Sequence, residues 1–382
     1  MMPDDGFAFL EPEGGGIAML GCGIIGLPLS GKTTVFNVIT GSGAEVKPYA
    51  GGRTDPNRAI VEVPDDRIEK LTELFKPKKR TPALVEFVDL AGLSRDASRG
   101  AGLGNAFLSF VAEADALVHV LRAFDNPEVP HPEETIDPLR DWNIVETELI
   151  LRDLGVTETR LNRLAAKKRL LPEEQTEADL LKICQEHLLE ERPLRDLPLG
   201  EDQLRLLRGF TFVSLKPELV VLNLDETQVR DDSIPGLADL EALCETRGMP
   251  LVRVYGRMEM ELASLSADEQ AEFMAELKVE ETGRKRLVYG AYGLLGLLSF
   301  FTVGPDEVRA WTLKNRATAV EAAGTIHSDL ARGFIRAQVV NYEEFMKHGG
   351  SFAACREAGV LRLEGKDYPV RDGDILEIRF NV

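Results

Sequence analysis

The chain has 382 residues, of which 44% are hydrophobic and 29% charged, so a soluble globular protein with two or three domains is expected. Its 64 acidic and 45 basic residues leave a formal charge of -19, which excludes a broadly basic nucleic-acid-binding surface and restricts any such contact to a local patch. The cysteines lie far apart and form no CxxC pair, which argues against a zinc site or a disulfide framework and favours a reducing cytoplasm; they are Cys22, Cys184, Cys244 and Cys355.

The N-terminal stretch is acidic, ends in glycines and lacks the basic and apolar segments of a signal peptide. We therefore expect residues 1–18 to be a disordered extension. Between residues 17 and 130, apolar strands alternate with helical stretches, which predicts an α/β domain with a parallel sheet covered on both faces. The expected strands are 17–25, 83–89 and 116–124, and the expected helices begin at Lys32 and cover 105–114.

A phosphate-binding loop is predicted after the first of these strands, where "GLPLSGKT" fits the pattern G-x-x-x-x-G-K-[ST]. The glycines allow backbone N–H groups to converge on phosphate oxygens, Lys32 supplies a cation for the outer phosphates, and the Thr33 hydroxyl is a ligand for Mg²⁺. A chance glycine turn is the alternative, but the strand before the loop and the helix after it argue against that. The predicted nucleotide-binding residues here are Gly26, Leu27, Pro28, Leu29, Ser30, Gly31, Lys32, Thr33 and Thr34.

The strand "ALVEFVDL" ends at Asp89 and leads into Asp89-Leu90-Ala91-Gly92. An aspartate at the carboxyl end of a strand beside the phosphate loop is well placed to hold Mg²⁺, and Gly92 can present its amide to a γ-phosphate. An aspartate that only caps the strand is the alternative. Leu93 follows, where many GTPases have the glutamine that orients the attacking water, so hydrolysis would need another group.

The pattern changes to helical spacing between residues 135 and 208, and Pro172 interrupts it. This predicts an antiparallel helical pair inserted into the sheet domain, because strands resume at 212–226 and 251–256. A single amphipathic arm is the alternative. At the end of the first resumed strand, Asn223-Leu224-Asp225-Glu226 occupies the place of a guanine-reading N-K-x-D motif. Because the lysine is absent and the last acid is a glutamate, guanine selectivity is doubtful, and a turn without base contact is the alternative.

The most apolar run covers residues 287–303, but it is short of the ~20 residues that a membrane span needs and is punctuated by glycines. A buried helix that leads into a strand is expected instead. Beyond it, strand-like runs at 307–313, 334–340 and 374–380 surround one helical candidate at 341–348. They predict a small α+β module.

These motifs together resemble the YchF or Obg-like ATPase family of translation-factor-class P-loop NTPases. The resemblance extends from Met19 to Val382, and its most specific part is the C-terminal string. It rests on "CGIIGLP", "GKTT", "TDPN", "VDLAGL", "GAGLGNAFLS", "LNLDE", "VRAWT", "AAGTIHSDLARGFIRAQVV" and "EGKDYPVRDGDILEIRFNV".

The resemblance implies a P-loop G domain in two segments, 19–134 and 209–280, with a helical coiled-coil arm at 135–208. It also implies a C-terminal TGS domain of β-grasp fold at 297–382. The family's function implies ATP in preference to GTP through an N-x-x-E motif, here Asn223 and Glu226, slow hydrolysis without a catalytic glutamine, and association with ribosomes. No membrane or DNA partner is expected.

The resemblance also supplies a second catalytic candidate besides Lys32. His131 aligns with a family histidine thought to help hydrolysis, although a solvated loop histidine is an equally good interpretation. Three departures concern the nucleotide site: Leu29 replaces a common asparagine that could hold potassium, Arg53 stands where a switch threonine is usual, and Tyr255-Gly256-Arg257 replaces a small base-contacting loop.

Two basic clusters are candidates for contacts with ribosomal RNA, although solvated faces are the more common reason for such runs. They are Lys76, Lys78, Lys79 and Arg80, and Arg284, Lys285 and Arg286. The leading hypothesis is a hydrolysing ATPase that docks on the ribosome. The alternatives are a nucleotide-gated binding protein with little or no turnover, and a P-loop kinase, for which we identify no lid arginines.

Overall fold

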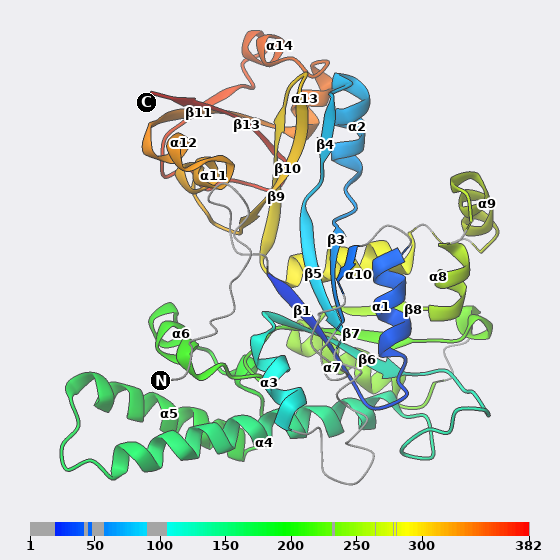
Figure 1. Cartoon of the computed structure of the whole chain (residues 1–382), viewed down its shortest axis with the longest axis vertical. Coiled ribbons are helices and arrows are strands. Elements are labelled where there is room, and N and C mark those ends of the chain that lie inside the picture. The colour runs from blue at the N-terminus through cyan, green and yellow to red at the C-terminus, as the bar shows by residue number, and fades with distance from the viewer. Residues whose placement is uncertain are drawn as a thin grey trace. The chain divides into compact units, whose positions relative to one another are not determined.

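The computed structural model describes residues 20–41, 45–47, 57–89, 105–230, 234–263, 265–277, 279 and 281–381 (Figure 1). The expected disordered extension, residues 1–18, lies outside these ranges. The chain forms two compact units. The larger unit contains Gly21–Val61 and Glu86–Leu294, and the C-terminal unit contains Glu62–Val85 and Leu295–Val382.

The larger unit is built on a seven-stranded sheet with the order β2-β3-β5-β1-β6-β7-β8. Strand β1 pairs in parallel with β5 and β6, and β6–β7 and β7–β8 are also parallel, whereas β2 and β3 are antiparallel. The expected parallel sheet is therefore confirmed. Its strands are β1 (Gly21–Ile25), β2 (Glu45–Lys47), β3 (Asn57–Glu62), β5 (Leu84–Asp89), β6 (Ala116–Arg122), β7 (Glu218–Asn223) and β8 (Leu251–Val254).

Helices cover both faces of this sheet, and every residue of β1, β6 and β7 is buried, as continuous apolar strands require. Helices α3 (Asn105–Glu113), α4 (Pro138–Ala165) and α7 (Leu237–Arg247) contribute to the cores on one face. Helices α1 (Lys32–Thr40) and α10 (Gly283–Leu294) pack together, and Gly290 of α10 lies against Leu219, whose side chain points to the opposite face. Helices α8 (Gly256–Leu262) and α9 (Ala267–Leu277) follow strand β8.

The predicted helical arm is a hairpin of α4 and α5 (Pro172–Leu189), followed by α6 (Glu201–Leu207) (Figure 1). Asp137 caps α4 by accepting a hydrogen bond from the Arg140 N–H, and Pro172 occupies the first turn of α5, where its missing N–H costs nothing. The helices bury Ile150, Leu181 and Cys184 with their neighbours, in a core separate from that of the sheet.

The C-terminal unit contains a six-stranded sheet with the order β12-β11-β13-β9-β10-β4. Strands β9 and β10 form an antiparallel pair, and β13 lies parallel to β9 at the centre. With α11 (Ala319–Ile326) packed on one face, this is the predicted β-grasp arrangement. The strands are β4 (Lys79–Thr81), β9 (Leu297–Val303), β10 (Glu307–Lys314), β11 (Phe334–Asn341), β12 (Arg362–Glu364) and β13 (Asp374–Phe380).

The expectation of one helix beyond residue 303 was wrong. The predicted helix is present as α13 (Tyr342–Lys347), but so are α11 (Ala319–Ile326), α12 (Ser328–Arg332) and α14 (Phe352–Glu357). Helix α11 begins with a capping box, in which the Glu321 carboxylate accepts hydrogen bonds from the N–H and hydroxyl of Thr318.

The C-terminal unit also contains residues 62–85, a segment that no sequence pattern separates from the predicted G domain. Helix α2 (Asp66–Phe75) packs on β9 and β10, with the Arg67 guanidinium 5.1 Å from the centre of the Phe301 ring. The rings of Phe75 and Phe345 stack at 6.1 Å. These contacts explain why residues 62–85 group with the C-terminal unit, whereas the expected boundaries placed them in the G domain.

The apolar run at 287–303 consists of the end of α10 and strand β9, as expected. Among the described residues, no helix combines the length and the hydropathy that crossing a membrane requires.

Candidate functional site: a phosphate loop at the end of strand β1

The phosphate loop connects β1 to α1 and depends on two glycines. Gly26 has a φ of 142°, and a Cβ atom there would lie 2.3 Å from the Val120 carbonyl oxygen. Gly31, the residue before α1, has a φ of 91°, and a Cβ atom there would lie 2.1 Å from Nδ2 of Asn223. Both the backbone conformation and the close approach therefore require glycine.

Lys32 is the first residue of α1, and its side chain turns back onto the loop. Its Nζ donates hydrogen bonds to the carbonyl oxygens of Gly26 at 2.9 Å and Leu27 at 2.8 Å, and only 4% of the residue is exposed. Burial lowers the pKa of Lys32 to about 8, although the charge of Asp89 opposes this effect. A triphosphate would offer this buried ammonium stronger acceptors than the two neutral carbonyls.

The predicted metal ligands, Thr33 and Asp89, lie together. The Thr33 hydroxyl donates to Oδ2 of Asp89 at 3.1 Å, and Asp89 is buried at the carboxyl end of β5. A hydroxyl and a carboxylate oxygen suit Mg²⁺, which takes few protein ligands and completes its shell with phosphate oxygens and water. The described residues contain no group of three or more His, Cys, Asp or Glu side chains that could hold a metal by themselves.

Ser30 provides a further polar group inside the loop. Its Oγ is buried and has no hydrogen-bond partner in the described part of the chain. An unpaired buried hydroxyl costs free energy, and a phosphate oxygen could satisfy it.

On the base side, the structure places Asn223 against the phosphate loop. Its Nδ2 donates to the Ser30 carbonyl oxygen at 3.1 Å, and Oδ1 lies next to Gly256 at the start of α8. The buried Asn223 amide thus lies between the phosphate loop and the Tyr255-Gly256-Arg257 segment. Leu224 is buried, whereas Glu226 is exposed at the start of a 3₁₀ turn.

His131 lies in the loop after β6, and both ring nitrogens are engaged. Nε2 lies 2.9 Å from Oδ2 of Asp141, and Nδ1 accepts a hydrogen bond from the Glu133 N–H at 3.1 Å. Its side chain is only 4% exposed, so the solvated-histidine interpretation does not hold. No hydrogen bond joins His131 to the described residues of the phosphate loop.

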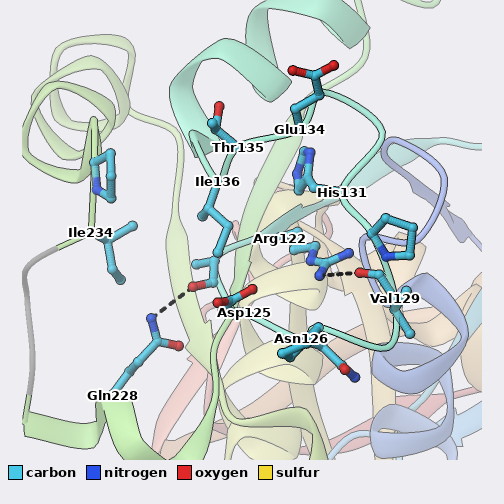
Figure 2. Close-up of a pocket in the computed structure, with 14 residues that line it drawn as sticks. Arg122, Asp125, Asn126, Val129, His131, Glu134, Thr135, Ile136, Gln228 and Ile234 are labelled. Atoms are coloured by element: carbon cyan, nitrogen blue, oxygen red, sulfur yellow. Dashed lines mark hydrogen bonds between the residues drawn. The ribbon is translucent and has the colours of Figure 1, made fainter.

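Arg122 holds the loop that carries His131, and sequence reasoning missed it. Its Nε donates to the Phe124 carbonyl oxygen at 3.1 Å, and its Nη2 donates to the Val129 carbonyl oxygen at 2.8 Å. Burial lowers the pKa of Arg122, and its Nη1 has no hydrogen-bond partner among the residues that the structure describes. Figure 2 shows Arg122 and His131 in one pocket of about 630 Å³. In the sequence, the signal for Arg122 was a charged residue at the end of an apolar strand.

Several predicted positions lie outside the described residues. They are Gly92, Leu93 and Arg53.

Internal contacts occupy much of the two predicted basic clusters. Lys78 and Lys79 pair with Asp306 and Glu307, and Arg80 pairs with Glu62 and Glu69. In the second cluster, Arg284 donates to the Ile39 carbonyl oxygen near the end of α1, and Arg286 donates to the Arg253 carbonyl oxygen.

Comparison with known proteins gives consistent results. Residues 297–381 match the family model YchF-GTPase_C, described as a protein of unknown function, and residues 21–151 match the model described as 50S ribosome-binding GTPase. The "Ribosome-binding ATPase YchF" of Bacillus subtilis is 42% identical over 365 residues, covering 95% of this chain and 100% of the relative. The protein of the same name from Pasteurella multocida is 41% identical over 364 residues, covering 94% and 99%.

A solved structure agrees. The Schizosaccharomyces pombe YchF GTPase matches with a TM-score of 0.83 at 31% sequence identity, covering 97% of this chain and 99% of that one. The P-loop G-domain fold and the predicted fold class are thereby confirmed. Because these relatives align over almost the full length of both chains, this chain belongs to the YchF family.

Proposed function

We propose that this chain binds ATP with Mg²⁺ at the phosphate loop, hydrolyses it slowly and associates with ribosomes in the cytoplasm. The observation that carries the proposal is the convergence of Lys32, the unpaired Ser30 hydroxyl and the Thr33–Asp89 pair at one end of the sheet. The relatives named ribosome-binding ATPase support the substrate and the partner.

Each part of the loop has a role in this proposal. Lys32 would exchange its two carbonyl acceptors for oxygens of the outer phosphates, and Thr33 and Asp89 would hold Mg²⁺. The metal would neutralise charge on the phosphates. The loop amides, Ser30 and Gly92 would complete the hydrogen bonds to the phosphate oxygens.

We expect ATP to bind at least as tightly as GTP, although GTP remains a candidate substrate. A guanine site pairs a buried carboxylate with the N1 and N2 protons of the base, whereas Glu226 is exposed and position 224 holds a buried leucine. Without that carboxylate, the penalty that such a site imposes on adenine is absent.

We propose His131 as the group that assists hydrolysis. Its Nε2 is bonded to Asp141 and its Nδ1 accepts from Glu133, so His131 must leave at least one of these partners before it can accept a proton from water. This need for rearrangement, together with Leu93 in place of glutamine, accounts for slow turnover.

A nucleotide-gated binding protein with little turnover is the second candidate. The observation that favours it is the same engagement of His131, because a histidine that keeps both partners cannot act on the nucleotide.

A titration of purified, nucleotide-free protein with fluorescent ATP and GTP, alongside phosphate release with and without ribosomes, tests the proposal. Lys32→Ala should abolish tight binding because no other lysine lies in the loop, and Lys182→Ala, which alters an exposed lysine of α5, is the matched control. Unchanged triphosphate affinity in Lys32→Ala would refute the site. A tenfold preference for GTP, about 1.4 kcal/mol, would refute the proposed base selectivity. Absence of hydrolysis even with ribosomes would favour the gated binder.

A further inference from the structure

The connection between α4 and α5 is basic. Residues 163–171 contain no acidic residue and four basic ones, Arg163, Lys167, Lys168 and Arg169. All four basic residues are exposed. We call these four residues the arm tip. Arg163 lies in the last turn of α4, where a cation also interacts favourably with the helix dipole.

Most of the positive charge of the arm tip is available to a partner. Lys167 pairs with Glu174, but the side chains of Arg163, Lys168 and Arg169 form no ion pair or hydrogen bond with any residue that the structure describes. The opposite holds for Lys78, Lys79 and Arg80, which all have acidic partners. The arm tip therefore differs from that cluster in having unpaired cations.

The arm also separates these cations from the acidic body of the protein. Asp153 is the last residue of α4 that bonds to the segment before β7, through the N–H groups of Val213 and Ser214. From Asp153 to Ala165, α4 extends for about 18 Å at 1.5 Å per residue, and Figure 1 shows the hairpin running away from the sheet. This distance exceeds the Debye length of about 8 Å at physiological ionic strength.

Screening resolves the conflict between a net charge of -19 and an RNA partner. Over most of the surface, the excess of acidic residues repels phosphodiester groups, whereas at the arm tip salt screens the charge of the body. Two acidic residues begin α5 nearby, but Glu174 is occupied by Lys167 and by the Leu171 N–H, which leaves Glu173.

We propose that the arm tip binds the phosphodiester backbone of ribosomal RNA. The inference rests on the ribosome association proposed above and adds the surface and the chemical class of the contact. Guanidinium and ammonium groups without acidic partners suit phosphates, which are bound through charge rather than through base sequence.

The test compares two triple variants of the full chain that have the same net charge. One is Arg163→Gln, Lys168→Gln and Arg169→Gln, and the control is Lys76→Gln, Lys78→Gln and Lys79→Gln. Cosedimentation with purified ribosomes over a series of KCl concentrations gives the affinity and its salt dependence. Circular dichroism and ATPase activity without ribosomes check that each variant is folded.

The arm-tip variant should bind ribosomes at least about tenfold more weakly. The slope of log affinity against log salt should fall by about 0.7–0.9 for each phosphate group that the variant no longer neutralises. The control variant should bind like the wild type. Wild-type affinity in the arm-tip variant, or equally weakened binding in both variants, would overturn the inference.

Two further outcomes separate this inference from the proposed function. A weaker affinity with an unchanged salt slope would show that the three cations do not neutralise phosphate groups, and it would overturn the RNA assignment. If the wild type fails to bind ribosomes, the proposed association fails, and the same variants titrated with protein-free ribosomal RNA still decide whether the arm tip binds RNA.

Discussion

Leu29 in the phosphate loop adopts a backbone conformation that is unfavourable for leucine. Its φ is 64°, in the left-handed region, and 52% of the residue is exposed. A side chain other than glycine costs roughly 1–2 kcal/mol there, and asparagine tolerates this region best among the others. The loop thus retains strain at a position where little burial compensates for it.

We predict that Leu29→Asn raises the free energy of unfolding by about 0.5–1 kcal/mol, because asparagine relieves the strain and leucine buries little there. Urea denaturation of the nucleotide-free protein measures it. Leu151→Asn is the control, since Leu151 is similarly exposed, at 55%, but lies within α4. That change should leave stability the same or lower it slightly. Reduced stability in Leu29→Asn would show that the leucine is stabilised by contacts that outweigh its strain.

The pairing of His131 with Asp141 gives a second prediction at the scale of single residues. If His131 assists hydrolysis, His131→Ala should lower the turnover number by about 10²-fold or more and leave ATP affinity nearly unchanged, because His131 would act on the nucleotide only in the transition state. Single-turnover phosphate release and nucleotide titration measure the two quantities separately. His187→Ala alters a histidine of the arm and should not change turnover. Equal turnover in wild type and His131→Ala would remove His131 from the mechanism.

At the scale of elements, a buried cluster of charges holds the base of the arm on the sheet. Nη1 of Arg195 lies 2.7 Å from both Glu146 of α4 and Glu218 of β7. Glu218 also accepts a hydrogen bond from Trp142 Nε1 and lies 2.7 Å from His119 Nδ1. Two buried carboxylates thus share one guanidinium.

Because they share one guanidinium, the carboxyl groups of Glu146 and Glu218 have different pKa values. Burial, with a contribution from the charge of Glu218, raises the pKa of Glu146 to about 7 although Arg195 opposes the shift. Burial also opposes ionisation of Glu218, but Arg195 and the bonds from His119 and Trp142 outweigh it and lower its pKa to about 2. Because glutamate titrates near 4.3 when unfolded, Glu146 contributes stability at low pH that is lost as the pH rises through about 7. Glu218 contributes stability above about 4.3 that is lost as the pH falls towards 2.

Between pH 5 and pH 8, we predict that the free energy of unfolding of Glu146→Gln falls by about 1–3 kcal/mol less than that of the wild type. The reason is that the amide cannot acquire a buried charge. Urea denaturation of wild type and variant at the two pH values measures the change. Glu148→Gln, two residues further along α4 and not fully buried, is the matched control. Equal pH dependence in wild type and Glu146→Gln would refute the assignment of the titration to this cluster.

The agreement between the predicted and the observed structure also differs from element to element. The start of α1 at Lys32 and the position of Asp89 at the end of β5 could be predicted, because a local motif and a continuous apolar run determine them. Helix α11 was missed because its small alanines produce little periodicity, although Thr318 and Glu321 carried the signature of a capping box. The contacts of Arg122, and of His131 with Asp141, join segments through tertiary packing, which no local pattern encodes.

At the scale of the whole molecule, the two units are not formed by two successive stretches of the chain. Residues 62–85 are flanked by segments of the larger unit, yet they supply α2 and β4 to the C-terminal unit. Strand β4 extends its sheet beside β10 in parallel, and Arg67 of α2 forms an ion pair with Asp372 at 2.6 Å. The family model for the C-terminal part covers only residues 297–381. That range therefore lacks part of the packed unit.

We predict that a fragment of residues 295–382 is poorly folded, and that joining residues 62–85 to it by a flexible linker restores a cooperative unit. Ile68 and Leu71 of α2 are fully buried, and burying such side chains contributes about 1.5–3 kcal/mol each, which is a large share of the stability of a small domain. Thermal unfolding followed by circular dichroism compares the two fragments. In the joined fragment, Ile68→Asp should abolish the added stability, since it places a charge in the packed interface, whereas Lys70→Asp, which alters an exposed residue of the same helix, should preserve it. Cooperative unfolding of the short fragment at the same temperature as the joined one would show that α2 adds no stability, and its packing on β9 and β10 would then have to serve another purpose.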